Sequence, residues 1–177
     1  MNRVTAFTLT TIALLCMAVV LPASDAVAQQ KQLISYKVTA ENSKYTQQHV
    51  IDVGDVPGHQ VRVYEIYRSY PNNAPVINGL KMKESWTRGV SDYTDGNGTS
   101  TIYGVTTMEN GDKIFSRGAL VAQSGGGGKL TATSVAALTG GTGKLAGIHG
   151  TVRAVTQAEP KAGVNETQTE LEYWMEK

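Results

Sequence analysis

Residues 60–69 read QVRVYEIYRS, and this stretch decides the fold class. Large apolar and aromatic residues recur at alternate positions, which is typical of a β-strand. One face of the predicted strand carries Val61, Val63, Glu65 and Tyr67, and the other carries Arg62, Tyr64, Ile66 and Arg68. Both faces mix apolar and charged side chains, so the alternation predicts the strand but leaves open which face turns inward.

The same alternation recurs along the chain between turn signals such as Asn110-Gly111, the favoured two-residue hairpin. Eight strands are predicted, residues 49–53 are expected to be extended as well, and no amphipathic helix is evident. The predicted strands are 33–41, 60–69, 80–90, 99–108, 113–121, 129–138, 151–158 and 166–175.

Eight short strands with hairpin spacing predict an all-β fold, an eight-stranded antiparallel up-and-down barrel, with a β-sandwich as the alternative. A barrel of this size holds its own side chains or one small ligand. The strand at 129–138 has small residues on both faces, which favours an internal cavity.

Composition excludes several classes of protein. The 177 residues are 41% hydrophobic and 18% charged, with 16 Lys plus Arg against 15 Asp plus Glu. The size fits one globular domain, and the net charge of +1 argues against a nucleic-acid partner.

The N-terminus has the pattern of a secretory signal peptide. Arg3 precedes an apolar stretch at 6–21, and the small-residue site Ala26-Val27-Ala28 predicts cleavage before Gln29. The apolar stretch is shorter than the roughly 20 residues of a spanning helix. We therefore expect a signal peptide at 1–28, one β-barrel domain at 29–177 without a membrane span, and a secreted or periplasmic location.

The residues offer no cofactor or metal site. Cleavage removes Cys16, the single cysteine, and the three histidines lack metal-ligand spacing. Residues 141–146 match the dinucleotide pattern G-x-G-x-x-A, but the glycines that follow would break the helix that a pyrophosphate needs.

Two mid-strand carboxylates, Glu65 and Glu84, share their faces with large apolar residues. If these faces turn inward, each carboxylate is buried and needs a cation such as Arg88 or Arg117, or its pKa rises. Glu65 is then the candidate catalytic group. The alternatives are a structural ion pair or an inward opposite face. The candidate cavity-binding residues are Val63, Tyr67, Glu84, Trp86, Arg88 and Arg117.

Two motifs resemble a known family. Residues 63–66 (VYEI) resemble the first barrel strand of plant allene oxide cyclases, and residues 138–153 (LTGGTGKLAGIHGTVR) resemble the Gly-rich signature of that family and of the related dirigent proteins. The resemblance implies a calycin-like eight-stranded barrel with an apolar cavity, a homotrimer, and Glu65 at the cavity floor. Apart from the resemblance, the glycines suit a tight crossover in which Leu145 and Ile148 plug one end of the barrel.

These observations favour an exported protein that binds a small hydrophobic or aromatic molecule. The first hypothesis is a cyclase or isomerase that uses Glu65. The alternatives are a non-catalytic, lipocalin-like carrier and a structural envelope protein whose barrel is filled by its own side chains.

Overall fold

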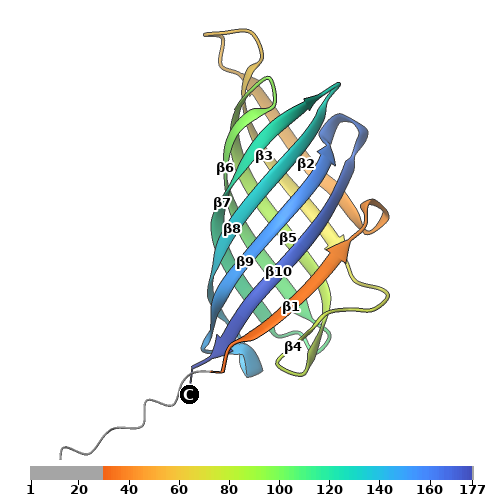
Figure 1. The fold of residues 1–177 in the computed structure, drawn as a ribbon, viewed down its shortest axis with the longest axis vertical. Helices are drawn as coiled ribbons and strands as arrows, with labels where there is room; N and C mark the ends of the chain where they lie inside the picture. Colours follow the sequence, from red (N-terminus) through yellow and green to blue (C-terminus); the bar gives the residue numbers. More distant parts are fainter. Residues whose placement is uncertain (1–29, 177) are drawn as a thin grey trace, which may run out of the picture.

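The computed structural model describes residues 30–176 (Figure 1). The predicted signal peptide, residues 1–28, lies outside the described residues. Strands make up 73% of the described chain and short 3₁₀ turns 6%, so the all-β prediction is confirmed. Among the described residues, no helix has the length and apolarity needed to cross a membrane.

The strands form an antiparallel sheet with the hydrogen-bonded order β1-β10-β9-β8-β7-β6-β5-β3-β2, and β4 pairs with β5. Three 3₁₀ turns, η1 (Ala40–Asn42), η2 (Gly143–Leu145) and η3 (Pro160–Ala162), lie in the connections. The strand bounds are β1 Gln32–Val38, β2 Ser43–Asp52, β3 His59–Ser69, β4 Val76–Ile77, β5 Leu80–Thr94, β6 Asn97–Met108, β7 Lys113–Gly126, β8 Lys129–Gly141, β9 Ile148–Glu159 and β10 Val164–Met175.

The described sheet has ten strands where eight were predicted. The first addition is β2, which extends well beyond the segment expected at 49–53. Its side chains are mostly exposed at the edge of the sheet, so its sequence lacks the apolar alternation of a half-buried strand. The second is β4, whose two residues are too few to produce a pattern.

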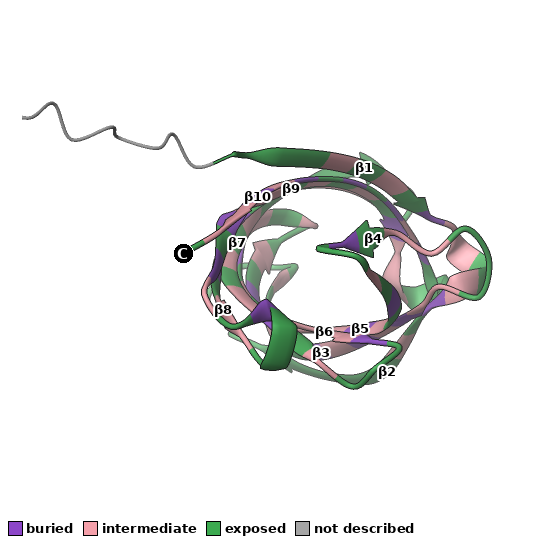
Figure 2. Ribbon diagram, turned by 90° about the horizontal axis from the view of Figure 1, so that it is seen from below, coloured by how far each residue is buried: buried purple, intermediate pink, exposed green. Residues whose placement is uncertain are grey.

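The sheet curls strongly on itself, and Figure 2 shows its strands as a ring seen from one end. The hydrogen-bonded path stays open in the described chain, because its end strands β1 and β2 do not pair with each other. Both strands nevertheless lie beside β10. Strand β1 pairs with it from Val38–Thr167 to Gln32–Tyr173, and β2 begins where the Ser43 hydroxyl donates to Asn165 Oδ1 at 3.1 Å. Side chains therefore connect β2 to β10 across the gap.

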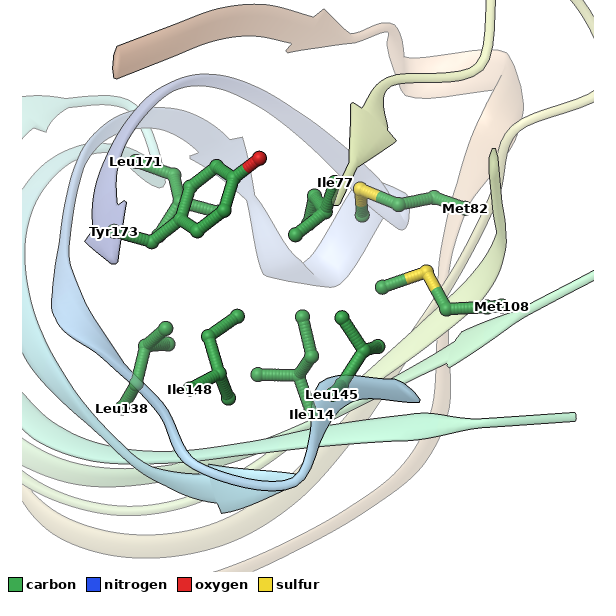
Figure 3. Packing of buried hydrophobic residues seen from close by; sticks show 9 residues of the cluster. All are labelled: Ile77, Met82, Met108, Ile114, Leu138, Leu145, Ile148, Leu171 and Tyr173. Atoms are coloured by element: carbon green, nitrogen blue, oxygen red, sulfur yellow. The ribbon is translucent and has the colours of Figure 1, made fainter. Parts of the chain in front are cut away.

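One end of the curled sheet is filled by an apolar cluster, the plug (Figure 3). Its side chains come from β4, from η2 and from the strands that meet at this end. Leu145 and Ile148 are 0% and 1% exposed within it, which confirms their predicted packing. The plug comprises Ile77, Met82, Met108, Ile114, Leu138, Leu145, Ile148, Leu171 and Tyr173.

The Gly-rich crossover holds Leu145 in the plug. Gly143, the first residue of η2, has a φ of +56°, and a Cβ there would overlap the Asp112 carboxylate. That carboxylate accepts a hydrogen bond from the backbone N–H of Lys144 at 2.9 Å. The absence of a Cβ at Gly143 thus allows the β6–β7 turn to lie close to the crossover. The crossover in turn positions Leu145 in the plug.

Candidate functional site

An internal cavity of about 160 Å³ lies between the walls of the curled sheet. One wall carries long aromatic side chains: Tyr36, Tyr45, Tyr64, Tyr70 and Tyr93. The facing strands β8 and β9 contribute small ones: Ala132, Ser134, Ala136, Ala154, Thr156 and Ala158. The small residues make room for a cavity, as the composition of 129–138 predicted.

A second hollow, of about 710 Å³, forms the mouth of the cavity. The turns around Gly58, Gly96 and Gly128 contribute to it, and these turns lie at the end of the sheet opposite the plug. The two hollows share Arg62, Tyr93 and Leu130, so they adjoin each other. The site therefore has an apolar floor, an inner chamber and an open mouth.

Strand β3 presents Arg62, Tyr64, Ile66 and Arg68 to the chamber. The ring of Tyr64 lies against its cross-strand partner Gly89, where a Cβ would overlap it. The Tyr64 hydroxyl is 3.0 Å from Ser100 Oγ, so its polar end is satisfied inside. Gly89 and Ser100 together explain how a large tyrosine fits flat against the inner face of the sheet.

Arg68 lies deeper along β3 and is only 9% exposed. Its guanidinium donates to Thr87 Oγ1 at 2.8 Å, to Asn165 Oδ1 at 2.9 Å and, more weakly, to Thr167 Oγ1 at 3.5 Å. These partners are neutral. The buried Nε–H of Arg68 has no hydrogen-bond partner among the described residues.

Arg62 occupies the boundary between the chamber and the mouth. Its guanidinium carbon lies 4.8 Å from the ring centre of Tyr64 and 5.7 Å from that of Tyr45. One terminal nitrogen donates to Gln48 Oε1 at 3.0 Å, and the buried Nε–H is unpartnered within the described chain. Cation–π contacts therefore hold this charge beside the entrance.

The tyrosines of the chamber are neutral phenols. Burial raises the pKa values of Tyr36, Tyr64, Tyr70 and Tyr93 above the ordinary phenol value. Tyr36 and Tyr70 pack edge to face with ring centres 6.0 Å apart, and the Tyr70 hydroxyl is 2.9 Å from Ser85 Oγ. At neutral pH these groups supply aromatic surface and hydroxyl hydrogen bonds, not negative charge.

The residues that the sequence placed in the cavity do not line it; the structure turns them to the outer face. On β3 and β5 it brings six of them together, while Arg117 lies on β7 beside Tyr103, separated from the others by β6. The structure therefore places these candidate cavity residues outside the chamber lining, as in the alternative of an inward opposite face. The residues concerned are Val63, Glu65, Tyr67, Glu84, Trp86, Arg88 and Arg117.

Glu65 belongs to an ion pair on this outer face. Its Oε2 is 2.7 Å from Arg88 Nε, and its Oε1 accepts a hydrogen bond from the Thr46 hydroxyl at 2.7 Å. The Glu65 side chain is 15% exposed and that of Arg88 is 53% exposed. Nearby, the rings of Tyr67 and Trp86 pack with centres 4.8 Å apart. The geometry matches the structural ion pair that the sequence left open.

The physical reason is that the inner face offers hydrogen-bond acceptors to the terminal nitrogens of Arg68. Hydroxyl and amide side chains from neighbouring strands accept hydrogen bonds from Arg68, so an arginine that looked solvent-facing is accommodated inside. The sequence nevertheless contains a signal for this face. Gly89 lies between strand-forming residues, and a glycine inside a strand often marks a close approach by a large neighbour.

A second polar cluster lies at the mouth end, at the start of β3. His59 Nε2 is 2.8 Å from Asp92 Oδ1, and His59 Nδ1 is 2.6 Å from Asp55 Oδ1. Hydrogen bonds to Asp92 and Asp55 raise the pKa of His59. The cluster ties the 53–58 turn to β5 and lies outside the chamber lining.

A scan against protein-family models and a search of curated proteins each found no match to this chain.

Proposed function

We propose that this is an exported β-barrel protein that binds one small apolar or aromatic molecule in its chamber, as a non-catalytic carrier of lipocalin type. The observation that carries the proposal is the chamber of about 160 Å³ between an aromatic wall and a wall of small residues. A cavity of about 150 Å³ in another protein holds a benzene ring. The chamber thus has the size for one aromatic ring, and the mouth gives the ring a way in.

A carrier function is better supported than a structural barrel or a cyclase or isomerase. A structural barrel filled by its own side chains would need bulk where β8 and β9 supply alanine, serine and threonine. A cyclase or isomerase that uses Glu65 would need that carboxylate in the chamber, but it is paired with Arg88 on the outer face.

The closed, calycin-like barrel is part of the proposal. The ring-like course of the strands in Figure 2 supports it, as does the Ser43–Asn165 hydrogen bond between β2 and β10. In this proposal, side-chain contacts between β2 and β10 close the barrel in place of a full set of backbone hydrogen bonds. Export is supported by the N-terminal sequence pattern.

We also propose that copies of the chain associate, as the expected homotrimer would. Valines on the outer faces of β3, β5, β7, β8 and β9 are between 45% and 55% exposed, and exposed apolar surface favours an interface. Light scattering of the purified protein should give an oligomer mass, and a monomer at every concentration would contradict this part. The valines are Val63, Val90, Val121, Val135 and Val155.

The test of carriage is to purify the protein from its own source without denaturation and to measure its mass by native mass spectrometry. We expect a bound small molecule that solvent extraction releases. The matched control is Ala154→Leu, which adds bulk to the small-residue wall and should remove the extra mass while the protein stays folded. Repeated recovery of bare wild-type protein would favour the filled barrel.

A further inference from the structure

The charged side chains that line the chamber are Arg62 and Arg68, both cationic. The ion pairs of the described residues join other groups and place no carboxylate on either arginine. The charge of Arg68 is the more costly of the two to accommodate, because this residue is nine-tenths buried. The chamber therefore concentrates positive charge between walls whose other polar groups are neutral.

A buried cation is costly unless it is paired and hydrogen-bonded. Thr87, Asn165 and Thr167 offer neutral oxygens to Arg68, which satisfy some of its N–H groups but leave its charge uncompensated. The Nε–H still lacks a partner within the described chain. The guanidinium is thus held in a fixed orientation. Its positive charge is not balanced, and its Nε–H has no acceptor, among the described residues.

The neighbouring tyrosines do not supply the missing negative charge. Tyr36 and Tyr70 lie close enough to Arg68 for its charge to favour their ionised forms, yet burial outweighs this effect and raises both pKa values. Both phenols therefore remain protonated at neutral pH. The compensating charge has to come from outside the described lining.

We infer that the ligand of the chamber is an aromatic or short amphiphilic acid whose carboxylate binds to Arg68. This inference rests on the proposed carrier function and names the chemical class of its ligand. The ring of the ligand lies between the tyrosines and the small-residue wall, and its carboxylate accepts hydrogen bonds from the guanidinium. Arg62, at the boundary with the mouth, attracts the same anion as it enters.

The test compares benzoate with benzamide, which have nearly the same shape but differ in charge. Affinities are measured by NMR titration of the wild-type protein. Hydrogen bonds to charged groups contribute about 1.5–3 kcal/mol, so we expect benzoate to bind roughly 10- to 150-fold more tightly.

The decisive variant is Asn165→Asp, which changes little in shape. It places a carboxylate where the Asn165 oxygen now lies, 2.9 Å from the Arg68 guanidinium. We expect benzoate affinity to fall about tenfold or more while benzamide affinity stays the same. Arg68→Gln should have the same selective effect, and Arg88→Gln, on the outer face, should leave both affinities unchanged. Thermal melting of each variant verifies that it is folded.

The results of these titrations distinguish the anionic ligand from the carrier function itself. If both compounds bind the wild type equally and Asn165→Asp changes neither affinity, the anionic ligand is refuted and carriage of a neutral molecule stands. If neither compound binds at millimolar concentration, carriage of a small aromatic molecule is itself overturned, and the inference falls with it. Selective loss of benzoate in Asn165→Asp supports both.

Discussion

Two residues on opposite faces of β3 should respond very differently to truncation. Ile66 is 4% exposed and faces the chamber, whereas Val63 is 52% exposed on the outer face. Replacing a buried isoleucine by alanine costs about 2–5 kcal/mol of unfolding free energy. Replacing a half-exposed strand valine costs at most about 1 kcal/mol, mainly through strand propensity.

The structure narrows the expected loss for Ile66→Ala. Its side chain borders the chamber, so part of its surface faces open space instead of packed atoms. The truncation therefore removes fewer contacts than it would in the plug, and we expect about 2–3 kcal/mol, the lower part of the usual range. For a domain of this size, that loss lowers the melting temperature by roughly 4–12 °C.

Urea unfolding followed by the fluorescence of Trp86 and Trp174 measures both variants, with circular dichroism as a second probe. Ile66→Ala should shift the midpoint clearly, and Val63→Ala should shift it little. A loss for Val63→Ala equal to or larger than that for Ile66→Ala would refute the orientation of β3. It would mean that the face of Val63 and Glu65 turns inward, which would overturn the chamber described above.

Three further predictions concern the plug, the outer face and the mouth. Leu145→Ala, at a fully buried position, should cost about 3–5 kcal/mol in urea unfolding, and a loss below about 1 kcal/mol would contradict the plug. Glu65→Gln should leave benzoate affinity unchanged and alter stability by about 1 kcal/mol or less; loss of binding by a folded variant would restore a role in the chamber. Contacts with Asp92 and Asp55 raise the pKa of His59 above its ordinary 6.5, so their stabilising effect is complete below pH 6.5 and is lost as the pH rises through the folded-state value. NMR titration of His59 should give a pKa above 6.5, and a value at or below it would show that the contacts are absent in solution.

Much of the fold could be predicted from the sequence, because local signals decide strands and turns. Asn110-Gly111 marks the turn between β6 and β7, which pair as an antiparallel hairpin. The apolar residues of the Gly-rich segment predicted a plug, and Leu145 is buried there. These features depend on residues close together in the chain, so alternation and turn chemistry are sufficient to identify them.

The inward face of β3 could not be predicted in this way. Both of its faces carry apolar and charged residues, and the choice depends on partners far along the chain. Arg68 is accommodated inside because Thr87 on β5 and Asn165 on β10 lie next to it in the folded sheet. The alternation of side chains along one strand does not register such distant partners, so it left open which face turns inward.

The edge strand β2 was predicted only in part, as the extended segment at 49–53, for a different reason. Almost every side chain of β2 after Ser43 is at least partly exposed, and the strand pairs with β3 alone in the hydrogen-bonded order. A solvated edge strand has no face that must be apolar, so its sequence carries little periodic signal. Its position beside β10 follows from the curvature of the whole sheet.

The central claim, that the chamber beside Arg68 holds an aromatic acid, is tested most directly by a crystal structure of the protein grown with benzoate. The account predicts density for the ring between the tyrosine wall and the small-residue wall, with the carboxylate within hydrogen-bond distance of the Arg68 guanidinium. A chamber filled by the protein's own side chains, or benzoate bound only on the outer face near Glu65, would contradict it.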